Sequence, residues 1–318
     1  MTGNAADTPR PLMVWGALAI VYVVWGSTYL GIKFAIETMP PMLSGSLRFA
    51  VAALLLGAFL LVRKGTAPFR MSGRQLGGAA LVGLLLLTGG NGMVAVAEQH
   101  ISTGLAALLV ASVPLWLVVF RIAARDRPAL LTLLGVLVGF GGVAALSLSG
   151  GGETASTTGI VVILVASLSW SIGSFLSARI PMPPNVWAAS AVEMAAGGLG
   201  LLVTGLSFGE RLDVAAVSGR SWAGLVYLIL VGSLVGFTAY TWLLGNAPIS
   251  LVSTYAYVNP AVAVVLGVLV VNEVATPQMI AGGAVILVGV ALVVSTERRA
   301  KVRTAPAVEE VQAQTSRS

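Results

Sequence analysis

The sequence predicts an all-α integral membrane protein in which ten transmembrane helices form two inverted five-helix repeats. Its 318 residues are 57% hydrophobic and only 9% charged, whereas a soluble domain carries about 25% charged residues. So few charges cannot cover a surface in water, which makes lipid the expected solvent of this chain. A series of long apolar runs and an internal repeat of about 146 residues complete the prediction.

Ten apolar segments follow one another along the chain, each close to the roughly 20 residues that a helix needs to cross a bilayer. Their apolar runs are continuous and lack the alternation typical of barrel strands, and turn or charge signals separate them. The segments are residues 13–36, 42–62, 75–97, 103–121, 129–148, 158–178, 186–206, 222–244, 250–271 and 277–295. We therefore expect a first repeat over 13–148, a second repeat over 158–296, and cytoplasmic tails at 1–12 and 297–318.

Positively charged residues are distributed unequally between the two sides of the predicted membrane protein. With the N-terminus inside and ten crossings, 14 of the 18 lysines and arginines fall in inner segments. Only Arg211 and Arg220 fall in outer loops, and Lys33 and Arg48 lie within helices. Because inner loops carry an excess of Lys and Arg, both termini are expected in the cytoplasm. This distribution also explains the net charge of +6 without a nucleic-acid partner.

The two halves of the chain repeat the same landmarks at a nearly constant shift. Trp25 corresponds to Trp170 at a shift of 145 residues, and Pro114 corresponds to Pro260 at a shift of 146. Each half holds five predicted helices, so the second half enters the membrane from the opposite side. Inverted repeats of this kind recur in secondary transporters, where two related halves surround one central site.

Ordered residue sets in both halves resemble a known family. The first half reads Trp25-Gly26-Ser27, Lys33, Pro40-Pro41 and Arg48-Phe49, and the second reads Val258-Asn259-Pro260-Ala261, Gly267, Glu273 and Ile280 to Gly289. Over about residues 13–296 the chain resembles the paired EamA repeats of the drug/metabolite transporter superfamily, which includes amino-acid and metabolite exporters of the YddG and YedA type. The resemblance implies ten helices, an inner-membrane location and export of small metabolites or drugs. The first repeat has Arg125-Asp126-Arg127 in place of the family's acidic Glu273, so no role of that glutamate carries over to it.

Aromatic and polar side chains within the spans mark a candidate substrate cavity. Trp25 and Tyr29 share one face of the first helix, and Asn91 lies on a glycine-rich face of the third. Polar groups in hydrocarbon are costly, so such faces turn toward a cavity or toward another helix. Pro114 and Pro260 free backbone carbonyls and are expected to kink and gate the fourth and ninth helices. The residues expected to bind substrate are Trp25, Tyr29, Asn91, Ser112, Trp116, Trp170, Phe237, Tyr240, Tyr255 and Asn259.

Two charged residues lie deep within the predicted spans. Glu193 is about 12 Å into the seventh helix at about 1.5 Å per residue, and an intramembrane acid is a candidate for proton coupling. A structural hydrogen bond is the alternative role for Glu193. Arg48 lies nearer the outer side, so the two are not expected to pair. We expect Arg48 to be structural, held by Glu37.

These observations predict a secondary transporter that exports amino acids or related small metabolites by alternating access. The resemblance places its cavity between helices 1, 3, 4, 6, 8 and 9. A multidrug exporter of the same superfamily is the first alternative, and a channel is another. A nucleotide-sugar carrier would need more deep Lys and Arg, and a metal hydrolase would need ligands that a chain with no cysteine and one histidine lacks. We expect no cofactor or metal, and a monomer is compatible with the sequence.

Overall fold

The computed structural model describes residues 11–125, 128–148, 156–236, 239–240, 242–243, 247 and 255–315. Across these residues the regular structure is helical, without a strand, which confirms the all-α class. Eight helices are long and apolar enough to cross a membrane, and two shorter apolar helices cover Gly219–Val235 and Val258–Val271. The count of ten spans stays a prediction.

In the first half the helices are α1 (Pro11–Ala35), α2 (Pro41–Lys64), the 3-10 turn η1 (Ala67–Phe69), α3 (Gly73–Gly83), the π-helix η2 (Leu84–Gly92), α4 (Met93–Ala97), α5 (Thr103–Val110), α6 (Val113–Ala123) and α7 (Leu130–Leu148). In the second half they are α8 (Thr157–Ser177), α9 (Val186–Ser207), the 3-10 turn η3 (Val214–Ala216), α10 (Gly219–Tyr227), the π-helix η4 (Leu228–Val235), α13 (Tyr255–Val271) and α14 (Pro277–Thr315). The segments α3, η2 and α4 form one span, as do α5 and α6.

The equivalent helices α2 and α9 pack against each other in opposite directions. A methyl group added to Gly45 of α2 would lie 3.1 Å from Leu201 of α9, and one added to Gly198 would lie 3.1 Å from the backbone nitrogen of Ala50. Contacts that move forward along α2 therefore move backward along α9. The short distances exist because glycine lets the two backbones approach closely.

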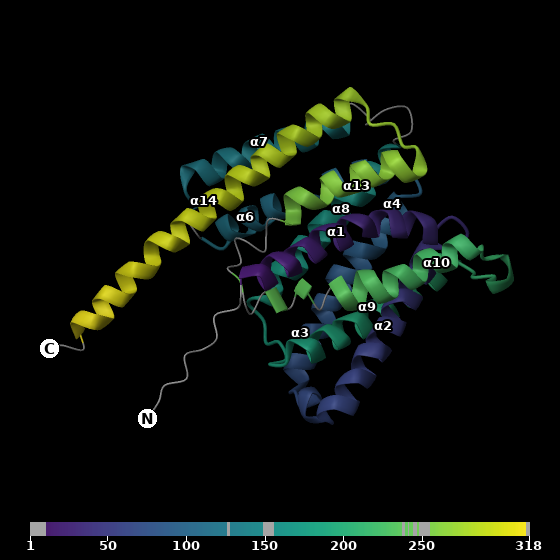
Figure 1. Ribbon diagram of the computed structural model, residues 1–318, viewed down its shortest axis with the longest axis horizontal. Helices are drawn as coiled ribbons and strands as arrows, with labels where there is room; N and C mark the ends of the chain where they lie inside the picture. The colour runs from purple at the N-terminus through teal and green to yellow at the C-terminus, as the bar shows by residue number, and fades with distance from the viewer. Residues whose placement is uncertain are drawn as a thin grey trace.

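The equivalent helices α7 and α14 form a second antiparallel pair. A methyl group on Gly135 would lie 3.0 Å from Leu292, and one on Gly142 would lie 2.8 Å from the backbone nitrogen of Ile286. Figure 1 shows α7 and α14 side by side along one edge, with α2, α3 and α9 toward the opposite edge and α1, α8 and α13 between them. The described helices of the two halves are thus interleaved rather than set apart as separate domains.

Two matched spans differ in shape at their prolines. The fourth span is interrupted at residues 111–112, and α6 begins at Val113 with Pro114 in its first turn. The matching residues 257–258 lie inside α13, which continues through Pro260. The third and eighth spans, by contrast, share a π-helical stretch at equivalent positions, η2 and η4. Such stretches are rare and are frequent at functional sites.

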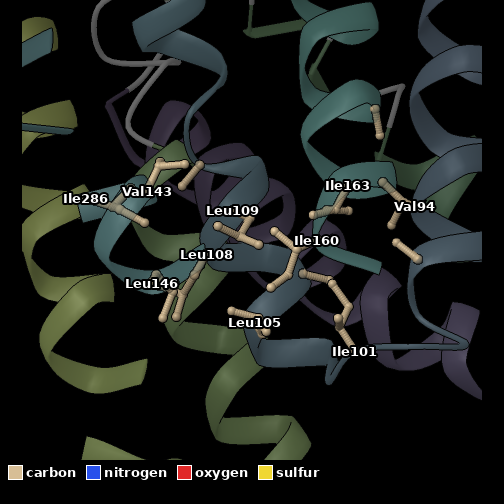
Figure 2. Close-up of a cluster of buried hydrophobic side chains, with 14 of the residues drawn as sticks. Val94, Ile101, Leu105, Leu108, Leu109, Val143, Leu146, Ile160, Ile163 and Ile286 are labelled. Atoms are coloured by element: carbon tan, nitrogen blue, oxygen red, sulfur yellow. The ribbon is translucent and has the colours of Figure 1, made fainter. Parts of the chain in front are cut away.

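A large apolar cluster holds the first half of the fourth span in place. In Figure 2, Leu105, Leu108 and Leu109 of α5 lie between Val143 and Leu146 of α7 on one side and side chains of α8 on the other. Each of these leucines is almost completely buried. The cluster therefore anchors α5 beside the centre of the molecule, where the candidate site lies.

The outer faces of the helices expose large apolar side chains. Leu137 of α7 is 70% exposed, and Leu199 of α9 is 62% exposed. In water such a surface would associate, whereas in lipid it costs little. The exposed apolar surface thus agrees with a membrane-spanning protein.

Candidate functional site

A cavity of about 120 Å³ lies at the centre of the molecule between helices of both halves. Its walls come from α1, α2, η2, α4, α5, α6, α8 and α13, and they are mainly apolar and aromatic. The lining residues are Trp25, Thr28, Tyr29, Ile32, Arg48, Phe49, Leu87, Asn91, Val94, Ala107, Val110, Ala111, Val113, Pro114, Trp170, Tyr255, Asn259 and Pro260. Central clefts with apolar walls and few polar groups are typical of small-molecule sites.

Most of the site residues expected from the sequence lie at this cavity. The shared face of α1 turns inward as expected, and both prolines are at the wall. The expected residues that line the cavity are Trp25, Tyr29, Asn91, Trp170, Tyr255, Asn259, Pro114 and Pro260.

Tyr240 lies behind the wall rather than in it. Its ring centroid is 4.8 Å from that of Trp25 and 6.1 Å from that of Tyr255, and Trp25 meets Tyr255 edge-on at 5.2 Å. Aromatic pairs at these separations stabilise one another beyond simple area burial. The three rings therefore form a joined aromatic cluster in which Tyr240 supports the two lining rings.

Four expected residues lie elsewhere or outside the described part. Ser112 is buried and donates a hydrogen bond to the Leu109 carbonyl at 2.7 Å, and Trp116 packs edge-on against Phe140 at 4.8 Å. Neither is among the lining residues. Glu193 is half-buried on α9 and does not line the cavity. Phe237 falls outside the described residues.

Arg48 is a cavity residue whose partners in the structure differ from the one expected from the sequence. It is only 4% exposed and lines the cavity. Its Nε donates to Ser233 Oγ at 3.0 Å, and its Nη1 donates to Asn91 Oδ1 at 3.2 Å. Glu37, its expected partner, instead forms an ion pair with Arg220 at 3.4 Å. A cation far inside a span was the available signal, because such residues are rare unless functional.

Asn259 ties α13 to α1 at the cavity wall. Oriented so that its side-chain nitrogen donates, it bonds the backbone carbonyls of Tyr255 and Tyr22 at 3.2 Å each. The carbonyl of Tyr22 belongs to the first half and Asn259 to the second, so this contact joins the two halves.

One end of the bundle, here called the cap end, is where α2 and α5 begin and where α9 and α13 end. Glu273, after α13, accepts hydrogen bonds from the backbone nitrogens of Thr103 at 2.7 Å and Gly104 at 3.2 Å. Glu210, after α9, accepts from Met42 at 3.2 Å and from the next residue, at the start of α2. A carboxylate stabilises the positive end of a helix dipole and satisfies free amides there. Two carboxylates of the second half thus cap the N-termini of two helices of the first half.

A third acidic residue, Glu98, is buried at the same end. It is fully buried, and neither side-chain oxygen has a hydrogen-bond partner among the described residues. Lys33 donates to its backbone oxygen at 3.0 Å. Burial raises the pKa of the Glu98 carboxyl well above its usual range; nearby Lys33 opposes this shift and Glu273 adds to it. Glu98 follows the third span, which ends at Ala97.

The EamA-like transporter family matches this chain twice, over residues 13–148 and 157–295. The chain belongs to the EamA-like transporter family. It is 41% identical over 257 residues to the "Uncharacterized inner membrane transporter YedA" of Escherichia coli K12, covering 80% of this chain and 82% of that protein. It is 25% identical to the "Probable terminal-alkyne amino-acid exporter" of Streptantibioticus cattleyicolor, covering 88% and 92% of the two chains.

A solved crystal structure shares the fold of this EamA-like protein. The two superimpose with a TM-score of 0.61 at 20% sequence identity, over 89% of this chain and 96% of the other. Family and fold together establish a two-repeat helical membrane transporter.

Proposed function

We propose that this transporter exports amino acids or related small metabolites across the bacterial inner membrane by alternating access. In this proposal ten spans form two inverted repeats, and both termini are cytoplasmic. The observation that carries the proposal is a cavity lined by both halves, together with hydrogen bonds that join the two halves at the cap end. The amino-acid class is supported by the exporter name of one relative.

The proposed orientation is supported by the distribution of charge and by the helix pairs. α2 ends at Arg63 and Lys64, and such basic segments favour the cytoplasm. The cap end, at the opposite end of α2, would then face outward. The antiparallel packing of α2 with α9 and of α7 with α14 supports the inversion of the repeats. A closed cap end would leave the cavity to exchange with the cytoplasm.

Counterflow in proteoliposomes tests the transport function. Vesicles loaded with one unlabelled solute at a time, from a panel of amino acids, nucleosides and cationic drugs, would take up its labelled form transiently. We expect saturable counterflow with amino acids. Counterflow with cationic drugs alone would establish the multidrug alternative, which the aromatic lining favours. Non-saturable flux or electrical current would establish a channel instead.

The orientation has its own test. The chain has no cysteine, so a single cysteine at Ser72, before α3, and another at Ser218, before α10, can each be labelled with an impermeant maleimide. We expect Ser218→Cys to react from outside the cell and Ser72→Cys only from the cytoplasm. Labelling of both from one side would overturn the inverted arrangement without touching the family assignment.

A further inference from the structure

Arg48 carries an unbalanced positive charge inside the cavity. It is the one charged side chain among the described residues of the lining. Its hydrogen-bond partners, Ser233 and Asn91, are neutral, as is the Phe49 ring, whose centroid lies 4.7 Å from the Arg48 Cζ. A charge withdrawn from water in this way is costly unless an opposite charge meets it. Nothing in the described walls of the cavity supplies that opposite charge.

The guanidinium also keeps free hydrogen-bond donors. Arginine has five N–H groups; one on Nε and one on Nη1 are used by the contacts to Ser233 and Asn91. The second N–H of Nη1 and both on Nη2 have no hydrogen-bond partner among the described residues. Gly232 adjoins Nη2, and a methyl group added there would lie 3.4 Å from it, in ordinary van der Waals contact.

The acidic residues near the cavity are engaged or placed elsewhere. Glu37 pairs with Arg220, and Glu273 caps α5. Glu98 lies beyond the end of its span, and Glu193 is not among the lining residues. A ligand is therefore the available source of an anion for Arg48.

We propose that Arg48 binds the carboxylate of the transported molecule, while the aromatic walls take up its apolar remainder. This inference rests on the proposed function and specifies its substrate class. A carboxylate matches the planar fork of a guanidinium. Its single negative charge balances the single cation of the lining, whereas a phosphate would leave excess charge. Trp25 and Trp170 line the same cavity and suit an apolar group.

The contacts of Arg48 link its ligand to both halves of the transporter. Arg48 and Asn91 belong to the first half, on α2 and η2, and Ser233 belongs to the second, on η4. A carboxylate that draws the guanidinium toward itself would loosen or realign these two bonds. Ligand binding would thereby weaken or shift the link that Arg48 makes between η2 and η4.

Matched ligands test the inference on the purified wild-type protein, without any transport assay. L-Phenylalanine and 3-phenylpropanoate carry a carboxylate, whereas phenylalaninamide and phenethylamine do not, and a leucine series repeats the comparison. Binding is read from the fluorescence of the cavity tryptophans and from the thermal unfolding midpoint. We expect the carboxylates to bind at least tenfold more tightly than the amide or amine. Phenyl phosphate is included as a competing anion, and we expect it to bind less well than the carboxylates.

Three variants assign the effect to Arg48. Arg48→Gln should lose at least tenfold in carboxylate affinity, and Arg48→Lys, which keeps the charge but not the fork, should lose less. Arg63→Gln removes a charge from the exposed end of the same helix and should bind as the wild type does. If Arg48→Gln does not fold, protection of Arg48 from phenylglyoxal by 3-phenylpropanoate in the wild type, followed by peptide mass spectrometry, replaces it.

The outcomes separate this inference from the proposed function. Equal binding of amides and acids, tighter binding of phenyl phosphate, or unchanged affinity in a folded Arg48→Gln would overturn the role of Arg48 while transport stands. Absence of binding by every probe, together with absence of counterflow for the whole panel, would overturn both.

Discussion

Glu273 and Thr103 are joined by a hydrogen bond of 2.7 Å between the Glu273 carboxylate and the Thr103 backbone nitrogen, although 170 residues separate them along the chain. Thr103 is the first residue of α5, and Glu273 follows α13. The contact thus joins the start of a first-half helix to the end of a second-half helix. A motion that opens the cap end must break this bond or carry both partners together.

Removing the charge of Glu273 should open the cap end more often. A carboxylate at a helix start contributes about 1 kcal/mol, so we expect Glu273→Gln to raise the maleimide labelling rate of a cysteine at Val94, a lining residue, about fivefold. Asp213→Asn removes a comparable cap from the exposed turn η3 and should leave the rate unchanged. Equal rates in wild type and Glu273→Gln would show that this carboxylate does not control access.

Glu98 should make stability fall as pH rises. Because the pKa of its carboxyl is raised in the folded protein, the folded state binds more protons than the unfolded state between the unfolded pKa, about 4.3, and the folded one. Stability is therefore greatest below about pH 4.3 and declines through this window. We expect Glu98→Gln to flatten the decline in thermal unfolding midpoint. Glu37→Gln, on an exposed carboxylate, is the control; an identical slope in Glu98→Gln would contradict the assignment.

Two tryptophans should differ in their effect on transport. Trp25 lines the cavity, so Trp25→Ala should reduce counterflow about tenfold, as expected for a loss of about 1.4 kcal/mol of ligand contact. Trp116 packs on Phe140 away from the lining, so Trp116→Ala should keep transport in whatever fraction remains folded. Asn91→Ala and Tyr255→Ala should behave as Trp25→Ala does. Normal transport by all three would place the site elsewhere.

Neighbouring glycines of α7 should tolerate substitution very differently. A methyl group on Gly142 would lie 2.8 Å from the Ile286 nitrogen of α14, whereas Gly141 has nothing within 4 Å. We expect Gly142→Val to destabilise the protein by about 1–3 kcal/mol through overpacking and Gly141→Val to be nearly neutral. Thermal unfolding midpoints of the two variants provide the measurement. Similar midpoints would argue against the close packing of α7 and α14.

Much of the lining of the candidate cavity could be predicted because a helix face repeats regularly. Trp25 and Tyr29 lie one turn apart and enter the cavity together, as helical periodicity requires. Trp116 was expected at the cavity because it lies close to Pro114 in sequence. It follows the interruption at 111–112 and is not among the lining residues.

The partners of Arg48 could not be predicted, for a different reason. Sequence spacing gave its depth but not the path of its long side chain, whose partners lie 43 and 185 residues away. Long-range partners of this kind depend on how helices pack, and one sequence does not specify that. Glu37 was expected to hold Arg48 because it lies nearby in the sequence, but it pairs with Arg220 instead.

The fourth and ninth spans differ in backbone geometry, as expected for a transporter that adopts two conformations. The backbone turns at residues 111–112, whereas the matching residues 257–258 are helical. In an alternating-access transporter built from two inverted repeats, we expect the two spans to exchange these backbone geometries between its two states. We expect that, in the second conformer, each half adopts the backbone geometry that the other half has in this structure.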